Sequence, residues 1–242
     1  MKSKVMRVGA KVIAAVCVAA AVNGCQLFNG ASSGEQSESA KEDVAAQGNA
    51  SAQNMIGNMY YYGKGVAQDY AEAVRWYRKA AEQGDAEAQC NLAHRYFNGH
   101  GVEKDYAKAM EWYRKAAEQG QTSAQLVLGF MYDEGLGVKQ DYAKAVEWYR
   151  KAAELGDAGA QTQLGVMYGK GLGVAQDHVE AVRWYRKAAE QGDVTAQYNL
   201  GGKYYMGEGV EKNIDEAKKW WSKAAEQGDA EAQEQLKKLA DK

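Results

Sequence analysis

The chain has 242 residues, of which 46% are hydrophobic and 26% are charged, a composition typical of globular proteins. Its formal net charge is −2, and because residues 1–24 carry four bases and no acid, the remainder carries −6. A mildly acidic chain lacks the positive charge that binding to nucleic acid requires, so we expect no nucleic-acid partner.

Residues 1–24 are predicted to form an export signal. Four bases precede the apolar run at residues 12–22, which small and polar residues follow. As a helix, this run would extend about 16 Å, against roughly 30 Å for the hydrocarbon core of a bilayer. We therefore expect the segment to be cleaved and not to anchor the chain by spanning the membrane.

The residues at the end of this signal resemble the bacterial lipobox. Val22, Asn23 and Gly24 precede Cys25, although Asn23 departs from the pattern of small residues. The resemblance implies that Cys25 is lipidated and becomes amino-terminal, so that the lipid alone contacts the membrane. Gln26, which stands where Asp would retain a lipoprotein in the inner membrane, implies an outer-membrane location facing the periplasm. The alternative is an ordinary secreted protein that is cleaved nearby.

Residues 25–44 are rich in Ser, Gly, Glu and Gln and contain little that could be buried, so we predict a flexible tether. If Cys17 leaves with the signal and Cys25 is acylated, Cys90 is the one thiol left. An exported protein of this kind has no intramolecular disulfide, and its stability must come from packing.

A 36-residue period dominates the rest of the chain, residues 45–242. Tryptophans stand at Trp76, Trp112, Trp148, Trp184 and Trp220, each 36 residues after the one before. The predicted units are residues 50–85, 86–121, 122–157, 158–193 and 194–229, with a cap at 230–242. Repeats of this length are supersecondary units that must stack on one another to bury their apolar faces.

Each unit is predicted to be a pair of helices. In the second unit, apolar residues recur at helical spacing from Ala88 to Tyr96 and form helix A. The glycines at 99 and 101 permit a tight turn, and Asp105 is placed to cap helix B, which continues until Gly120. The position after the helix A leucine is always small, so we expect the backbone of helix B to approach closely there. These small residues are Gly57, Ala93, Gly129, Gly165 and Gly201.

The pattern AEAQxxLGxMYxxGxGVxxDYxKAxxWYxKAAEQGD can be traced through all five units, with departures at Ala93, Gln121, His178 and residues 213–215. It resembles the Sel1-like repeat, a relative of the tetratricopeptide repeat, across residues 50–229. The resemblance implies an all-α fold, an α/α superhelical solenoid with a C-terminal capping helix. It also implies a non-catalytic role in assembling proteins, without a cofactor.

The fifth, ninth and twelfth positions of helix A differ among the units. By analogy with tetratricopeptide arrays, they are predicted to line a concave, exposed face that binds a protein or peptide in the cell envelope. The candidate residues are Tyr61, Cys90, His94, Phe97, Leu126, Phe130, Asp133, Tyr198 and Tyr205. The alternative is that variable surface positions acquired scattered apolar residues with no binding role.

The sequence leaves two other functions as alternatives. Cys90 and His94 are one helical turn apart and could form a metal site with Asp133, but no fourth ligand is evident, so no metal is expected. Cysteine-rich relatives of the Sel1-like family include proteins that bind or hydrolyse β-lactams, and an envelope enzyme or penicillin-binding protein is therefore the alternative function. Those relatives carry paired cysteines in each repeat, whereas Cys90 stands alone, and no catalytic motif is present.

Overall fold

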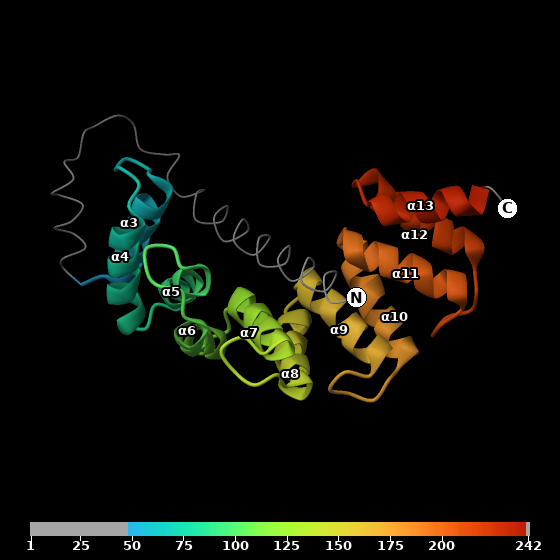
Figure 1. Cartoon of the computed structure of the whole chain (residues 1–242), viewed down its shortest axis with the longest axis horizontal. Coiled ribbons are helices and arrows are strands. Elements are labelled where there is room, and N and C mark those ends of the chain that lie inside the picture. Colours follow the sequence, from blue (N-terminus) through green and yellow to red (C-terminus); the bar gives the residue numbers. More distant parts are fainter. Residues whose placement is uncertain (1–47, 241–242) are drawn as a thin grey trace. The chain divides into compact units, whose positions relative to one another are not determined.

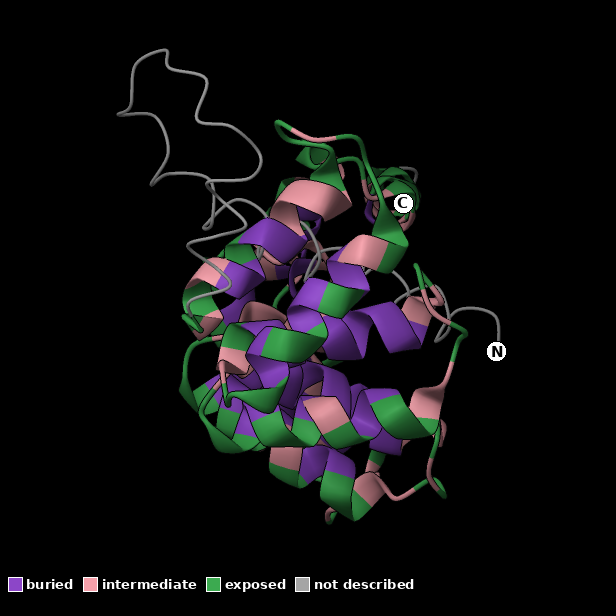
Figure 2. Cartoon of the chain, turned by 90° about the vertical axis from the view of Figure 1, so that its left-hand side faces the viewer, coloured by how far each residue is buried: buried purple, intermediate pink, exposed green. Residues whose placement is uncertain are grey.

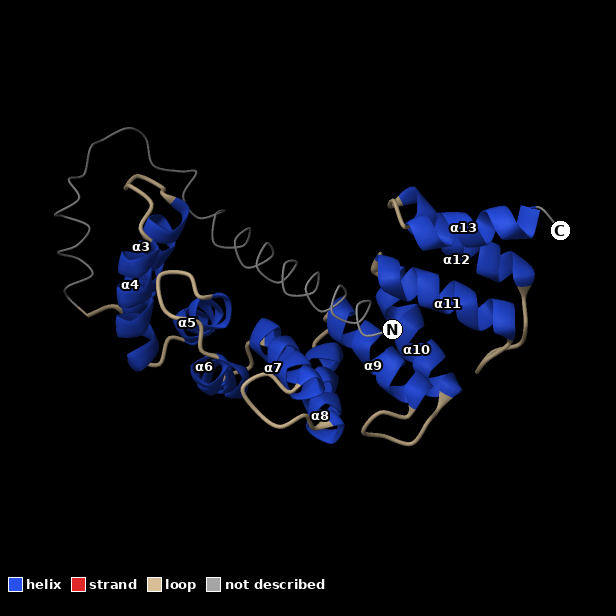
Figure 3. Cartoon of the chain, viewed as in Figure 1, coloured by secondary structure: helices blue, strands red, loops and turns tan. Residues whose placement is uncertain are grey.

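A computed structural model of the chain describes residues 48–240, which form two compact units, residues 48–139 and 140–240. The predicted signal, the lipidation site at Cys25 and the tether at 25–44 lie outside the described residues. Within residues 48–240 the chain forms helices joined by turns, and no strand occurs there (Figure 3). The expectation of an all-α repeat fold is confirmed.

The helices follow one another as antiparallel neighbours within each unit (Figure 1). The first unit contains α3 (Ala50–Tyr62), α4 (Tyr70–Glu82), α5 (Ala86–Asn98), α6 (Tyr106–Glu118) and α7 (Thr122–Glu134). The second unit contains α8 (Tyr142–Glu154), α9 (Ala158–Lys170), α10 (His178–Glu190), α11 (Val194–Met206), α12 (Ile214–Glu226) and α13 (Ala230–Ala240). Odd-numbered helices up to α11 are the A helices, and even-numbered helices are the B helices.

Each B helix begins where the sequence places a capping residue. Oδ1 of Asp69 accepts hydrogen bonds from the backbone N–H groups of Ala71 and Glu72 at 2.8 and 3.0 Å. Asn213 replaces Asp in the last repeat and accepts from the Glu216 N–H group at 3.0 Å. These bonds satisfy N–H groups that lack partners inside the helix, so the cap fixes the start of the helix.

The small residue of helix A faces an aromatic ring of helix B. A Cβ atom at Gly57 would lie 2.6 Å from Cδ1 of Tyr77, and one at Gly201 would lie 2.6 Å from Cδ1 of Trp221. The rings of Tyr77 and Trp221 are 1% and 3% exposed. The prediction of close approach is therefore right in position and wrong in cause, because a buried ring and not the helix B backbone occupies the space. Figure 2 shows the buried residues along the helix sides that meet other helices.

The glycine turn of one repeat packs on the start of helix B in the preceding repeat. Gly101 has φ +74°, and a Cβ atom there would overlap the carbonyl group of Tyr70. Gly209, also at φ +74°, meets the carbonyl group of His178 in the same way. Only glycine fits both the left-handed backbone and the close approach, so the turn fixes how neighbouring repeats stack.

Glutamine side chains form a second contact between repeats. Nε2 of Gln119 donates to Oε1 of Gln89 at 2.8 Å, and Nε2 of Gln89 donates to the buried carbonyl oxygen of Ala81 at 3.1 Å. In the second unit, Gln227 donates to Gln197 of the same repeat at 2.9 Å, and Gln197 donates to the Ala189 carbonyl oxygen of the preceding repeat at 3.2 Å. Buried polar groups are tolerated when they are hydrogen-bonded. Because these bonds have specific partners, they fix the alignment of neighbouring helices more precisely than apolar packing alone.

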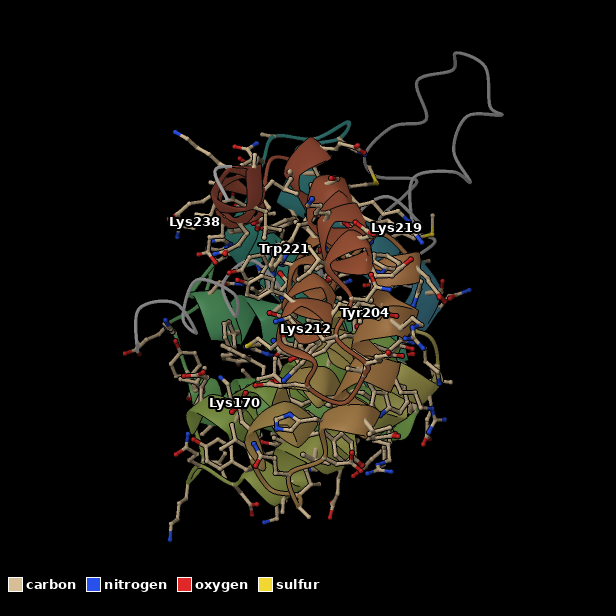
Figure 4. All side chains as sticks on the ribbon, turned by 90° about the vertical axis from the view of Figure 1, so that its right-hand side faces the viewer. Lys170, Tyr204, Lys212, Lys219, Trp221 and Lys238 are labelled. Atoms are coloured by element: carbon tan, nitrogen blue, oxygen red, sulfur yellow. The ribbon has the colours of Figure 1, made fainter. Side chains whose placement is uncertain are left out.

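The chain ends in α13, which packs on α12. Ala232 is fully buried in a cluster with Trp221, and Leu236 and Leu239 pack against it. Nε1 of Trp221, labelled in Figure 4, donates to the Tyr198 carbonyl oxygen at 3.0 Å. Every helix within residues 48–240 is too short or too polar to cross a membrane.

Candidate partner-binding site

Four of the predicted partner-binding side chains are buried. His94 is 9% exposed, Phe97 is 7%, Leu126 is 2% and Phe130 is 8%. The expectation that these side chains lie on an exposed face is wrong. Helix A contacts other helices on more than one side, so a position that varies among repeats is not always a surface position.

His94 and Phe97 of α5 pack on α6 of the same repeat. Nδ1 of His94 lies 3.1 Å from the hydroxyl oxygen of Tyr113, and the Phe97 ring lies 5.0 Å from the Tyr106 ring and 6.5 Å from the Tyr113 ring. Burial, together with the positive charge of Arg95, lowers the pKa of His94 to about 3. A neutral imidazole that is hydrogen-bonded inside the repeat is part of the core.

Leu126 and Phe130 belong to α7, in which each residue from Ala124 to Tyr132 is buried. The helix is apolar on all sides at this point, which is the pattern of a buried helix and not of an amphipathic one. Neither side chain is therefore available on the surface of the folded chain.

The other predicted residues retain some exposure. Tyr61, Cys90 and Asp133 of the first unit and Tyr198 and Tyr205 of the second unit are half-buried. The Tyr205 ring packs 5.6 Å from the ring of Trp221, where it also belongs to the edge of the core. The prediction that these five residues contact a partner stays a prediction.

The structure does not assemble the metal site that was considered for Cys90, His94 and Asp133. Sγ of Cys90 lies 3.5 Å from Oγ of Ser123, and Nδ1 of His94 faces Tyr113. Across residues 48–240, no group of three or more His, Cys, Asp or Glu side chains is placed to hold a metal ion.

The most unusual side chain of the first unit is Arg95 of α5. It is 6% exposed, and its buried Nε and Nη1 atoms have no hydrogen-bond partner. No carboxylate of residues 48–240 forms a salt bridge with it. Burying a charge without hydrogen bonds is costly, so native proteins rarely retain such a group without a reason.

A cluster of three aromatic side chains packs on this guanidinium group through Tyr61. The Tyr61 ring covers its face, with the ring centroid 3.7 Å from Cζ of Arg95. The hydroxyl oxygen of Tyr61 lies 3.4 Å from Nδ1 of His100, and the rings of His100 and Tyr70 stack with their centroids 5.5 Å apart. We call Arg95, Tyr61, Tyr70 and His100 the Arg95 site.

The Arg95 site combines a buried cation with an exposed aromatic rim. Tyr70 is 39% exposed, His100 is exposed, and Tyr62, which packs edge-on 4.8 Å from Tyr61, is 42% exposed. Tyrosine and arginine are the residue types on which protein interfaces most often depend for their binding energy.

Of the Arg95 site, only Tyr61 is predicted from the sequence to contact a partner. The signal for Arg95 was present, because the tenth residue of helix A is Met in the first, third and fourth repeats but Arg95 in the second and Lys203 in the fifth. A charge at a position that is otherwise apolar marks a repeat that differs from the framework.

Comparison with protein families gives a match over most of the chain. The Sel1 repeat model matches residues 50–85, 86–121, 122–157, 158–193 and 194–229. Among curated proteins, none matches the chain.

Several solved structures are similar to the chain. One is a protective antigen present in uropathogenic Escherichia coli strains that displays an SLR fold, with 44% identity and a TM-score of 0.80 over 82% of this chain and 42% of that one. This chain therefore spans less than half the length of that antigen. A Sel1 repeat protein from Oxalobacter formigenes has 39% identity and a TM-score of 0.77, covering 90% of this chain and 86% of that chain. A putative sel1 repeat protein from Klebsiella pneumoniae subsp. pneumoniae has 26% identity and a TM-score of 0.50, covering 83% and 97%.

Proposed function

Because the chain belongs to the Sel1 repeat family, whose members are generally protein-interaction scaffolds, we propose that it is a non-catalytic scaffold that binds a protein or peptide partner. We place the contact at the Arg95 site and its rim. The observation that carries this proposal is the group of stacked aromatic side chains at Tyr61, Tyr62, Tyr70 and His100, of which the last three are exposed.

The framework of the repeats does not require this group. Tyr70 occupies the first position of helix B, which is Tyr in the first three repeats and is His178 and Ile214 in the fourth and fifth. His100 lies between the two turn glycines, a position that is variable in the other repeats. Since the fold tolerates other residues at both positions and only the second repeat has His between the turn glycines, the combination of His100 with Tyr61 and Tyr70 is particular to this part of the chain and supports recognition over packing.

Site-specific crosslinking in the cells that make the protein tests the proposal. A photoreactive phenylalanine analogue at Tyr62 should capture one defined partner. The same analogue at Leu155 in the second unit, which is 61% exposed, should not capture it. Tyr70→Ala combined with Tyr61→Ala should reduce the yield from the Tyr62 position. Equal capture from both positions, or capture that survives the double substitution, would contradict the proposal.

We also propose that the scaffold is held in the cell envelope by lipid on Cys25, at the outer membrane facing the periplasm. The basic and apolar pattern of residues 1–24 and the lipobox-like residues 22–25 support this location. Labelling with an alkyne-tagged fatty acid should mark the wild-type chain and not the Cys25→Ser variant, which should also leave the membrane fraction. An unlabelled wild-type chain would favour the ordinary secreted protein.

A further inference from the structure

The positions of Arg95, His100 and Tyr70 have equivalents in each repeat that stacks on a preceding one. In each, the residue between the two turn glycines donates its backbone N–H to the carbonyl oxygen of the tenth helix A residue. His100 donates to Arg95 at 3.2 Å, and Glu208 donates to Lys203 at 3.1 Å. The turn also packs on the first residue of the preceding helix B, as Gly101 does on Tyr70. The same three positions are therefore brought together each time.

In the third and fourth repeats, these three positions hold only uncharged side chains. Met131, Leu136 and Tyr106 fill them in the third repeat, and Met167, Leu172 and Tyr142 fill them in the fourth. Met131 and Met167 are 0% and 1% exposed. An apolar set is thus sufficient for the fold at this place.

The fifth repeat has a buried cation there and supplies a carboxylate for it. The Lys203 side chain is 12% exposed, and its Nζ atom lies 2.5 Å from Oε2 of Glu208 and 3.2 Å from Nδ1 of His178. The bond from Lys203 holds the pKa of Glu208 below its usual value. Where the tenth position is charged in this repeat, the turn residue brings the compensating anion.

The second repeat has the cation without the anion. Arg95 replaces the apolar residue, but His100 and Tyr70 stand where Glu208 and His178 stand in the fifth repeat. Tyr61 covers the face of the guanidinium group, whereas the N–H donors of that group point outward in its plane. Two of those donor atoms, Nε and Nη1, are unpartnered.

From this comparison we propose that Arg95 receives a carboxylate of the bound polypeptide, at the place that the Glu208 carboxylate takes beside Lys203. The inference rests on the proposed scaffold function and names the chemistry of its partner. A carboxylate matches the guanidinium group in charge, and its oxygens accept hydrogen bonds from N–H donors such as the unpartnered ones of Arg95. The exposed rings of Tyr70 and His100, which pack on Tyr61, contact the neighbouring residues of the partner.

The first test asks whether the site accepts a carboxylate at all, and needs no partner. His100→Glu supplies the acid from within the chain, as Glu208 does. Arg95→Met restores the residue that three other repeats have. The measurement is the Tm of the intact chain. His100→Glu should raise the Tm by about 3 °C when Arg95 is present, and should not raise it in the Arg95→Met background. An equal effect in both backgrounds would overturn the proposal.

The second test asks whether an external carboxylate binds. The probes are acetyl-Gly-Phe-Glu-Gly-amide, the same peptide with Gln for Glu, and acetyl-Gly-Phe-Gly with a free terminal carboxylate. The Nε–H resonance of Arg95 in the intact chain should shift with the Glu peptide and not with the Gln peptide. Arg95→Met should abolish binding, and His100→Glu should weaken it by about tenfold, since it fills the site.

The partner's carboxylate could belong to an acidic side chain or to the carboxyl terminus of the chain. Binding of the peptide with the free terminal carboxylate identifies a chain terminus as a ligand. Inorganic phosphate is included as a general anion. Binding of the Glu and Gln peptides with equal strength, binding that survives Arg95→Met, or a response to phosphate alone would overturn the proposal. If crosslinking from Tyr62 still captures a partner in such a case, the scaffold function stands and only the carboxylate inference fails.

Discussion

A Cβ atom at Gly165 of α9 would lie 2.5 Å from Cε1 of Tyr185 on α10. The Tyr185 ring is 5% exposed, so it has little room to move away. We expect Gly165→Ala to lower the free energy of unfolding by about 1–2 kcal/mol, because the displaced ring outweighs the better helix propensity of alanine. Urea denaturation measures the change.

Gly169 on the same helix provides the matched control. A Cβ atom there would lie 3.6 Å from Cβ of Ala181, which is an ordinary contact. Gly169→Ala should therefore leave stability unchanged or raise it by up to about 1 kcal/mol. The two substitutions are chemically identical, so effects of the same sign would show that the ring of Tyr185 does not decide the outcome.

The helices of this fold could be predicted from the sequence because each repeat encodes its own boundaries. The Asp or Asn caps and the paired glycines predict where the helices begin and end. The 36-residue period predicts that the helix pairs stack as repeats. The facing ring at positions such as Tyr185 could not be deduced, because sequence spacing shows that a close approach exists and does not show which atoms make it.

The candidate site is harder to predict, because variation among repeats does not imply exposure. His94 and Phe97 vary and are nevertheless buried against α6, and Arg95 is next to His94 in the sequence. Helix A packs on its own partner helix and on neighbouring repeats, and only coordinates show which of its sides remains open. The charge pattern at the tenth position was the better guide, since a buried cation requires an explanation wherever it lies.

Replacing Arg95 should stabilise the isolated protein. Its guanidinium group is buried without a carboxylate, so Arg95→Met should raise the free energy of unfolding by about 1–3 kcal/mol. Lys203→Met is the matched control, because Lys203 is paired with Glu208 and its removal leaves that carboxylate with His178, at 4.0 Å, in place of the lysine. We expect the control to give a smaller gain or a loss. If chemical denaturation shows Arg95→Met to be the less stable variant, contacts such as the one with Tyr61 outweigh the cost of the buried charge.

Acid should destabilise the first unit through His94. Its pKa is about 3 in the folded chain and about 6.5 when unfolded, so the unfolded chain takes up the proton first. The contribution of neutral His94 to the free energy of unfolding is fully present above about pH 6.5. It is lost as the pH falls towards 3, by at most about 1.4 kcal/mol per pH unit. The stability difference between the wild type and His94→Gln should therefore shrink on acidification.

Two half-buried carboxylates change the stability in the opposite direction as the pH falls. Burial raises the pKa of Asp157 and Asp193 in the second unit, so they favour the folded state as the pH falls through their raised pKa values. Both remain in His94→Gln and cancel in the difference between the two proteins. Urea denaturation between about pH 7.5 and 4.5 checks the prediction, and a difference that does not vary with pH would refute the assignment to His94.

The glutamine contacts between repeats should contribute more to stability than glutamines on the surface. Gln89 is 5% exposed, donates to the Ala81 carbonyl oxygen at 3.1 Å and accepts from Gln119 at 2.8 Å. Gln89→Leu removes both of these hydrogen bonds, while the Ala81 carbonyl oxygen keeps the bond from the Gly84 N–H group, so we expect a loss of about 1–3 kcal/mol for the two bonds together. Gln176 donates to the Gly169 carbonyl oxygen at 2.9 Å on the surface, where water can replace it, and Gln176→Leu should cost less than about 0.5 kcal/mol. Equal losses in urea denaturation would show that burial of the bond does not set its contribution.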